Sequence, residues 1–553
     1  MTPPVRLVFL GGLGEIGRNC CCLEVDGRIL VIDCGLMFPA DDMPGVDLVL
    51  PDFTFLRDHA DAVDGVVVTH GHEDHVGGLA YLLRDVRAPI YGSPLALGLA
   101  RNRIDEAGLL GRTELIPVAD GETRRIGAVD CEFIPVTHSV PYSVAVAYST
   151  PAGTILHTGD FKLDLTPVDG RRTDLGRLGE LGRAGVRLLL SDSTNAERPG
   201  FTASESTIGP VMRNLFRDHP TRRFIVASFA SHLHRVQQVA REAIDAGRRV
   251  AFLGRSMTQN VTLGREMGIV DLPTDAIIDA EEVARFAPGE VCVICTGSQG
   301  EPMSALSLMA THEHKLLKVS SDDVVVLSAH AIPGNEPGVH RVIDGLHRAG
   351  ALVLHEATAP VHVSGHASRE ELKFMLGLAQ PDWFIPVHGE YRHLVHHAAL
   401  GVEMGLSATQ VVVCVDGDAV SLDAGGLDVE RRAVPAGYQY VDGIAGDIGH
   451  GVLRDRRSLA EEGFVVVIVT VDAVSGELVT GPEIVTRGWI YEGEANELLE
   501  DARAAVRDAI RETTGDGTVD FEALRRAARR ALAKLINERT RRRPAVLPVV
   551  MEV

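Results

Sequence analysis

The sequence predicts an α/β protein of several domains, in which a β-rich body is interrupted by a parallel α/β unit and followed by a small α+β tail. Residues 1–204 and 351–426 are rich in short β-favouring runs, whereas residues 205–350 alternate strands with helical stretches. After a loop-like linker at 427–447, residues 448–553 have the pattern strand, strand, helix, helix, strand. A length of 553 residues fits this division, since one domain takes about 150 residues.

The amino-terminal stretch "VFLGGLGEIGRNC" contains a G-x-G-x-x-G pattern at Gly12, Gly14 and Gly17, with Asp33 farther on. In a dinucleotide-binding enzyme a helix opens at these glycines and its free N–H groups hold the pyrophosphate. Here the chain continues as "CCCLEVDGRILVIDCG", two apolar runs around an Asp-Gly pair, which predicts a β-hairpin. We therefore do not expect a dinucleotide-binding oxidoreductase.

Composition indicates a cytoplasmic protein that makes no contact with membranes. No run of about 18 apolar residues is present and the start lacks a secretory pattern. The formal net charge of -22 argues against nonspecific nucleic-acid binding but does not exclude a local basic site. Cys292 and Cys295 lie three apart on a predicted strand and should point to opposite faces, so we expect buried thiols and not a metal site.

Positive charge gathers near the end of the chain, in "LRRAARRALAKLINERTRRRP". This segment is predicted to be an amphipathic helix with an apolar stripe that includes Leu524 and Leu532. Its basic face has three possible roles, which the sequence leaves open: a solvated surface, an RNA contact or a subunit contact.

The stretch "VVVTHGHEDHVGG" carries the strongest chemical signal. A buried-type strand ends at a cluster of four ligand-type residues: His70, His72, Asp74 and His75. Crowding imidazoles and a carboxylate in this way is costly unless a cation organises them, so the cluster predicts a metal site.

Further ligand-type residues stand where other apolar runs give way to loops. They are His138 in "CEFIPVTHSV", Asp160 in "GTILHTGDFK" and His388 in "DWFIPVHGEYR". Such loops are where α/β architectures gather active sites. Together with the histidine cluster they make seven ligands, enough for the two-metal centre used in metal-assisted hydrolysis.

At this point the sequence closely resembles the metallo-β-lactamase superfamily, whose H-x-H-x-D-H signature it matches in full. The resemblance implies that His70, His72 and His138 hold the first metal, that Asp160 bridges, and that Asp74, His75 and His388 hold the second. Asp33, at the end of "ILVIDCG", matches the superfamily's acidic residue that orients ligands. The opening glycines would then line a loop beside the metal cleft.

The long gap between Asp160 and His388 looks like the β-CASP insertion of nucleic-acid-processing members, with Asp192 in "SDSTNA" and His366 in "HVSGHAS". The segments "GGLGEIGRN", "GRSM", "CTGSQGEP" and "HAIPGNE" resemble the bacterial ribonuclease J family. The implied fold is a metallo-β-lactamase αββα sandwich with an inserted β-CASP α/β domain and a small α+β C-terminal domain. One departure is "FASHLHR", where the family pattern leads us to expect Asn at His232, whose role is open.

The resemblance also implies an activity and its partners. These are 5′-to-3′ exonuclease and endonuclease cleavage of single-stranded, preferably 5′-monophosphorylated RNA, in RNA maturation and mRNA decay. The implied cofactors are two divalent metal ions, zinc or manganese, because histidine and carboxylate ligands suit both. The tail resembles the family's oligomerisation region, so a homodimer or homotetramer is expected.

Outside the metal ligands, we expect His366 to donate a proton to the leaving oxygen, with Asp192 as its orienting carboxylate. Candidates for RNA phosphate binding are His234, Arg235, Arg255, Ser256, Ser364 and His366. The alternatives are a β-CASP DNA nuclease, a small-molecule ester or lactone metallohydrolase, and a non-catalytic RNA-binding scaffold. The scaffold is disfavoured because every ligand position is intact.

Overall fold

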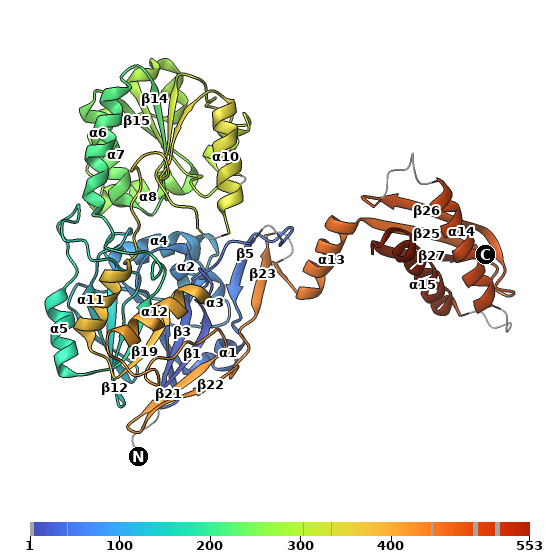
Figure 1. Cartoon of the computed structure of the whole chain (residues 1–553), viewed down its shortest axis with the longest axis horizontal. Helices are drawn as coiled ribbons and strands as arrows, with labels where there is room; N and C mark the ends of the chain where they lie inside the picture. The colour runs from blue at the N-terminus through green and yellow to red at the C-terminus, as the bar shows by residue number, and fades with distance from the viewer. Residues whose placement is uncertain are drawn as a thin grey trace. The chain divides into compact units, whose positions relative to one another are not determined.

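The computed structural model describes residues 5–40, 42–301, 303–332, 334–443, 446–489, 496–514 and 520–553. The chain forms two compact units. The larger unit comprises residues 1–38 and 49–438, and the smaller comprises residues 39–48 and 439–553. Figure 1 shows the β-rich body and the inserted α/β domain within the larger unit.

The body is a sandwich of two mixed sheets. Between them lies a core of alternating apolar side chains such as Leu7, Phe9, Phe133, Val146 and Leu188. The eight-stranded sheet has the order β22 (Gly426–Glu430), β21 (Ala419–Asp423), β1 (Val5–Gly11), β3 (Cys20–Val25), β4 (Arg28–Ile32), β6 (Val63–Val67), β7 (Ile90–Gly92), β8 (Leu115–Pro117). The six-stranded sheet has the order β19 (Trp383–Val387), β13 (Val186–Asp192), β12 (Gly153–His157), β11 (Val144–Thr150), β10 (Val129–Pro135), β9 (Thr123–Ile126).

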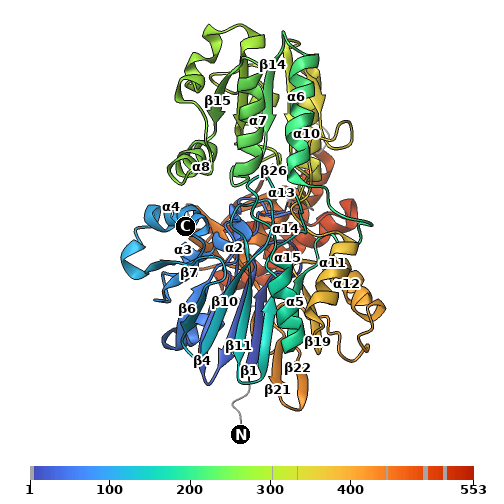
Figure 2. The ribbon, with the colours of Figure 1, turned by 90° about the vertical axis from the view of Figure 1, so that its left-hand side faces the viewer.

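Helices cover the outer faces of the sandwich. On the six-stranded sheet an apolar layer joins the strands to α5 (Leu175–Ala184), α11 (Arg369–Ala379) and α12 (Tyr391–Glu403), and Figure 2 shows these helices on one side of the body. Four helices lie between strands of the eight-stranded sheet in the sequence: α1 (Thr54–Asp58), α2 (Glu73–Val76), α3 (Leu79–Leu82) and α4 (Pro94–Glu106). Of these, α4 contacts β7 and β8 of that sheet, and α3 contacts α4. The sequence predicted a β-rich segment at 351–426, but the helices α11 and α12 lie there as well. Their apolar residues face the sheet.

The predicted hairpin is confirmed. Strands β3 and β4 pair antiparallel, and both turn residues, Asp26 and Gly27, have positive φ angles of 53° and 71°. Such a turn follows the right-handed twist of the strands. The glycine-rich segment contains the two-residue strand β2 (Leu13–Gly14), which pairs with β20 (Gly389–Glu390), and the described residues from β1 to β4 contain no helix. The dinucleotide-binding geometry is therefore absent from this part of the chain.

The inserted domain is a parallel sheet between two helical layers. Its order is β15 (Arg249–Leu253), β16 (Val291–Cys295), β14 (Arg223–Ala227), β17 (Asp323–Leu327), β18 (Leu352–Leu354). One face packs on α6 (Ile208–Asp218), α7 (Leu233–Asp245) and α8 (Arg255–Glu266), the other on α9 (Ala305–Ala310) and α10 (Glu336–Arg348). Cys292 belongs to the first core and Cys295 to the second, which confirms that the two thiols are buried on opposite faces.

In the smaller unit, β26 (Leu478–Arg487), β25 (Phe464–Val471) and β27 (Ala545–Glu552) form a sheet whose core is shared with α14 (Asn496–Thr513) and α15 (Phe521–Thr540). This is the predicted α+β tail. The sequence reasoning missed α13 (His450–Glu462), a largely exposed helix, and the short strands β23 (Tyr438–Asp442) and β24 (Gly446–Ile448) near the expected linker. Among the described residues no helix is long and apolar enough to cross a membrane.

A buried ion pair anchors both chain segments that connect the inserted domain to the body. Arg235, fully buried at the start of α7, donates two hydrogen bonds to Glu205 on the entering segment, at 2.5 and 2.7 Å. Its Nη1 also donates to the carbonyl and hydroxyl of Ser328, and that hydroxyl donates to the carbonyl of Val361 on the returning segment. Because all these polar groups are buried away from water, the loss of one hydrogen-bond partner would leave the other group unpaired and would destabilise the fold.

We expect Arg235→Ala to lower the free energy of unfolding by about 3–5 kcal/mol, because the change leaves the Glu205 carboxylate buried and uncompensated. Urea denaturation measures this effect. The control is Arg217→Ala, which removes an exposed pair with Asp218 and should cost about 1 kcal/mol or less. Equal stability of the two variants would contradict the anchoring role.

Candidate metal centre

The seven predicted metal ligands lie together at one edge of the sandwich, each just beyond the end of a strand. His70 and His72 follow β6, and Asp74 and His75 lie on α2 immediately after them. His138 follows β10, Asp160 follows β12 and His388 follows β19. Residues from both sheets and from both sides of the insertion therefore meet in one place.

One group consists of His70, His72, His138 and Asp160, whose potential ligand atoms all lie within 4.8 Å of one another. His72 Nδ1 is 3.1 Å from His70 Nε2 and 3.2 Å from His138 Nε2. His138 is oriented by its other nitrogen, which lies 2.8 Å from the carbonyl oxygen of Gly365 on the segment that returns from the inserted domain. Ring nitrogens aimed at one point suit a cation.

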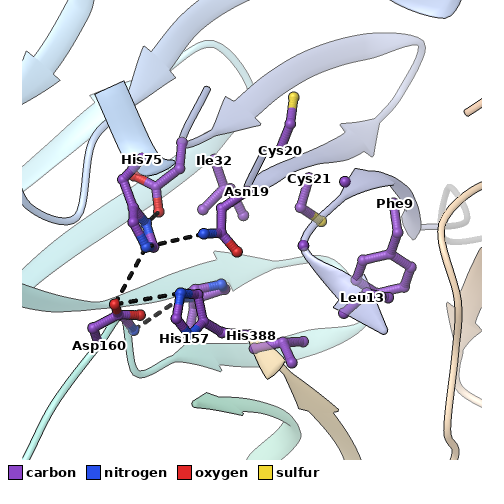
Figure 3. Close-up of a pocket in the computed structure, with 15 residues that line it drawn as sticks. Phe9, Leu13, Asn19, Cys20, Cys21, Ile32, His75, His157, Asp160 and His388 are labelled. Carbon is purple, nitrogen blue, oxygen red and sulfur yellow. Dashed lines mark hydrogen bonds and ion pairs between the residues drawn. The ribbon is translucent and has the colours of Figure 1, made fainter. Parts of the chain in front are cut away.

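The second group consists of Asp74, His75, Asp160 and His388, again within 4.8 Å. Asp160 belongs to both groups: its Oδ2 is 3.3 Å from His75 Nε2 and 3.5 Å from the Nε2 atoms of His70 and His388. Figure 3 shows His75 and His388 directed at this carboxylate. A carboxylate shared between two groups of histidines fits a dinuclear metal centre.

Burial divides the histidines into two kinds. Burial lowers the pKa of His72 to about 4 and takes the pKa values of His70 and His138 well below the ordinary range, so these three rings are neutral. Burial opposes charge on His388 too, but the Asp160, Asp192 and Asp74 carboxylates raise its pKa to about 10. Neutral imidazoles and ionised carboxylates are the forms that bind metals, so His70, His72 and His138 are ready to bind a cation, whereas His388 must release its proton when a cation binds.

Asp33 stabilises the loop that carries the metal ligands. Its Oδ1 accepts from Thr69 N at 2.8 Å, and its Oδ2 accepts from Thr69 Oγ1 and contacts His75 Nδ1, both at 2.8 Å. Asp33 is almost fully buried and has a positive φ of 57°. This left-handed backbone conformation is costly for a non-glycine residue and is stabilised here by the surrounding contacts.

Asp192 and His366 form a pair beside the two groups. His366 Nδ1 is 2.8 Å from Asp192 Oδ2 and 4.0 Å from Asp160 Oδ2. Burial works against charge on His366, but the Asp192 carboxylate and its hydrogen bond raise the pKa of the ring above its ordinary value. His366 can therefore carry a proton at neutral pH, with Nδ1 engaged by Asp192 and Nε2 left for substrate.

Thr194 connects this pair to the metal ligands. Its hydroxyl lies 2.8 Å from Asp192 Oδ1 and 2.7 Å from His388 Nδ1. His388 has a positive φ of 52°, so its ring direction depends on such contacts. Through Thr194 one carboxylate, Asp192, orients both the predicted proton donor and a predicted metal ligand.

The opening glycines allow Asn19 to reach the metal ligands. Asn19 Nδ2 is 3.0 Å from the carbonyl oxygen of Asp74 and 3.1 Å from His75 Nε2, and Figure 3 shows the side chain directed at His75. Gly12 has a φ of +90°, and a Cβ there would overlap Asn19 Oδ1. Gly12 is thus needed for a close approach within the protein and not for a nucleotide.

The predicted phosphate contacts lie in different environments. Arg255 and Ser256 are exposed at the start of α8, and Ser364 Oγ accepts from Asn195 Nδ2 at 2.8 Å. His234 Nε2 is 3.5 Å from Asp169 Oδ2. Arg235 is fully buried, and its guanidinium is engaged by Glu205 inside the protein. His232 is also buried, 3.4 Å from Glu205 Oε2, and burial lowers its pKa to about 4.

Sequence reasoning missed several residues that orient the centre, namely Asn19, Thr69, Thr194 and the carbonyl of Gly365. Thr69 and Thr194 stand next to or two residues from predicted functional groups, which is a signal that could have pointed to them. Gly365 also stands beside predicted residues, Ser364 and His366, but its carbonyl contacts His138, far away in the sequence. Asn19 likewise contacts Asp74 and His75 across the fold, so the three-dimensional arrangement is needed to reveal both contacts.

A two-sheet αββα sandwich with histidines and carboxylates gathered around one buried aspartate defines a metallo-hydrolase of the metallo-β-lactamase type. Family models match the chain in sequence order: the metallo-beta-lactamase superfamily at residues 13–196, the ribonuclease J beta-CASP domain at 221–346, the Zn-dependent metallo-hydrolase RNA specificity domain at 356–414, and the ribonuclease J C-terminal domain at 451–553. The predicted fold class is confirmed.

Full-length relatives give the same result. The chain is 39% identical to ribonuclease J2 of Bacillus subtilis, covering 100% of this chain and 99% of that protein. It is 41% identical to ribonuclease J of Mycolicibacterium smegmatis and 42% identical to that of Mycobacterium tuberculosis, each covering 99% of this chain and 97% of the relative. The chain belongs to the ribonuclease J family and is a hydrolase of that family.

A solved structure supports the fold alone. A protein of unknown function from Enterococcus faecalis has a TM-score of 0.52 and 15% identity, covering 76% of this chain and 100% of that one.

We expect Thr194→Val to weaken metal affinity or activity by about 10- to 100-fold, because it removes the hydroxyl that orients His388 and Asp192. Competition with a chelator measures the affinity and hydrolysis of an activated phosphodiester measures the activity. Thr409→Val, at an exposed threonine, is the matched control. The proposed orienting role fails if both variants retain wild-type values.

We expect Gly12→Ala to displace Asn19 from Asp74 and to lower metal affinity, because the new Cβ overlaps the Asn19 amide. Gly111→Ala is the control, since a Cβ at that position meets nothing within 4 Å. Metal content after dialysis at limiting zinc distinguishes the two. Equal content in both variants would show that the glycine has no part in ordering the centre.

Proposed function

We propose that the chain is a metal-dependent ribonuclease that degrades single-stranded RNA from 5′-monophosphorylated ends and also cuts internally. We assign it to RNA maturation and mRNA decay in the cytoplasm, acting as a homodimer or homotetramer. The observation that carries the proposal is the His366–Asp192 pair, which lies against the same Asp160 carboxylate as both groups of histidines. It adds a proton donor to a hydrolytic metal centre.

The metal assignment follows from the two groups of side chains. His70, His72 and His138 would hold one divalent ion, Asp74, His75 and His388 a second, and Asp160 would serve both. Zinc and manganese both suit this set of nitrogen and oxygen donors. When bound, such ions supply an acidified water and neutralise charge that develops on the phosphate.

The chain's own residues then orient substrate and move the proton. Asp192 holds His366 Nδ1, so that Nε2 points a proton at the leaving 3′ oxygen. Asp33 and Thr69 keep the His75 ring in place, and the carbonyl of Gly365 does the same for His138. The exposed Arg255 and Ser256 at the start of α8, together with Ser364 on the returning segment, are the proposed phosphate contacts.

The runner-up is a DNA nuclease of the same architecture, because the metal chemistry acts on the phosphodiester, which RNA and DNA share. Discrimination between them must come from contacts to the 2′-hydroxyl. A small-molecule ester hydrolase is less well supported, since the hydrolysis of a small substrate does not require the inserted domain. The RNA assignment is favoured by full-length similarity to ribonucleases J.

The test uses a 5′-monophosphorylated single-stranded RNA labelled at its 5′ end, with zinc or manganese added to the dialysed protein. We expect wild type to release labelled mononucleotide, and His75→Ala and Asp74→Ala to release none. A DNA of matched sequence should survive. Intact RNA with cleaved DNA, or with a cleaved small ester, would overturn the substrate assignment.

We expect His366→Ala to lower kcat by about 10²- to 10⁴-fold while metal content stays at the wild-type level. A substrate with a sulfur leaving group needs no protonation and should restore most of the lost rate. His340→Ala, at an exposed histidine of α10, is the control. If the sulfur substrate shows the same loss as the oxygen substrate, His366 does not donate the proton.

A further inference from the structure

The helix α15 of the smaller unit concentrates positive charge in an acidic chain. Residues 521–543 carry nine arginine or lysine residues and two glutamates, although the whole chain has a formal net charge of -22. The apolar side of the helix is fully buried in the core that α15 shares with α14 and the sheet, through Leu524, Ala528, Leu532 and Ile536. Figure 1 shows these elements at the C-terminal end of the chain. The helix is therefore held by its apolar side, and its basic residues are exposed to solvent.

The basic residues of α15 are spaced so that they share one side of the helix. One stripe has members four, four and seven positions apart: Arg526, Arg530, Lys534 and Arg541, the last at the C-cap. A second stripe beside it contains Arg525 and Arg529. Positions four and seven apart lie on the same side of an α-helix, and a step of four residues advances about 6 Å along the axis. We call these six side chains the basic face of α15.

Half of the basic face has no carboxylate partner. Arg525, Arg526 and Lys534 are paired with Glu522, Asp520 and Glu538, which lie on α15 or at its N-cap. The other three members are exposed and form no ion pair with the residues that the structure describes: Arg529, Arg530 and Arg541. Two further exposed arginines without such a pair, Arg542 and Arg543, follow directly. The positive charge of this region is therefore not neutralised by the described part of the chain.

We propose that the basic face of α15 binds the sugar–phosphate backbone of the RNA substrate, as a second RNA site in a different compact unit from the metal centre. The proposal rests on the function proposed above, because it takes RNA as the substrate. A row of regularly spaced positive charges suits a linear polyanion better than one small anion. A concentrated basic stripe on a helix is also the electrostatic feature that marks a nucleic-acid site.

The kind of basic residue supports phosphate as the group that is bound. Eight of the nine basic residues in 521–543 are arginines. The guanidinium group is planar, stays charged at every physiological pH and can donate two parallel hydrogen bonds to the oxygens of one phosphate. Such contacts do not depend on base sequence, so this face would add affinity for RNA of any sequence.

Two other partners fit the basic face less well. An amphipathic helix that binds a membrane inserts its apolar side, but in α15 that side is buried in the protein core. A subunit interface has a core that is rich in apolar and aromatic side chains and poor in charge. Within α15, all of which the structure describes, no exposed side chain is large and apolar. The face therefore lacks the anchors that contact with a second copy of the chain requires.

The test measures how salt affects the binding of a long single-stranded RNA to the full chain, with a chelator present so that the RNA is not cleaved. One triple variant changes the unpaired members of the basic face: Arg529→Gln, Arg530→Gln and Arg541→Gln. The control triple variant lowers the net charge equally, at exposed arginines of the larger unit that have carboxylate partners: Arg125→Gln, Arg217→Gln and Arg285→Gln.

We expect the plot of log affinity against log salt concentration to become less steep by about 2 in the α15 variant, since each phosphate contact to a single strand contributes about 0.7 to the slope. The control variant should keep the wild-type slope. With metal added, KM for the long RNA should rise in the α15 variant at least about five-fold more than KM for a dinucleotide, which is too short to span many phosphate contacts.

Equal slopes for wild type and the α15 variant would overturn the second RNA site while leaving the ribonuclease assignment intact. Equal slopes together with a change in the oligomeric mass of the α15 variant, measured by sedimentation, would assign the face to a subunit contact instead. The expected difference in slope without cleavage of any RNA by wild type would support the binding site and remove the proposed catalytic function.

Discussion

The carboxylate of Asp160 is the group on which the rest of the site depends. It is 2% exposed, and five histidine side chains have a ring nitrogen within 4.0 Å of it: His70, His75, His138, His366 and His388. A buried charge of this kind is tolerated only when it is compensated from several directions. The neighbouring histidines lower the pKa of Asp160 well below its ordinary value despite burial, so the carboxylate stays ionised. The histidines that supply this compensation follow the ends of three strands, β6, β10 and β19, or lie on the segment that returns from the inserted domain.

This requirement explains why the chain leaves the body and returns to it. Asp160 precedes the inserted domain, whereas Gly365, His366 and His388 follow it, so the centre is complete only when the returning segment packs against the first part. The Arg235–Glu205 pair stabilises the crossing point, and Glu371 joins the loops on the other side of His366. The same buried polar contacts therefore fix the position of the inserted domain and the geometry of the catalytic residues. A substitution that disturbs one should also disturb the other.

The sequence was sufficient for residues whose chemistry is local. His70, His72, Asp74 and His75 stand within six positions, and the hairpin follows from one Asp-Gly turn between apolar runs. Other features depended on long-range packing. α13 is polar along most of its length and left no apolar stripe to detect, and α11 and α12 were obscured because their apolar residues resemble β runs when no partner surface is known. Arg235 appeared as a free cation in the sequence, yet its partner Glu205 is 30 positions away.

The glycine-rich opening illustrates how one pattern serves two kinds of close approach. In a dinucleotide site the missing side chains make room for a pyrophosphate at a helix terminus. Here Gly12 makes room for the Asn19 amide, and Asn19 in turn contacts Asp74 and His75. Both cases need backbone with positive φ and no Cβ, so the letters alone cannot distinguish them. What separates them is the next element: a helix would expose N–H groups to a ligand, whereas the β3–β4 hairpin buries its own and turns the loop toward the metal ligands.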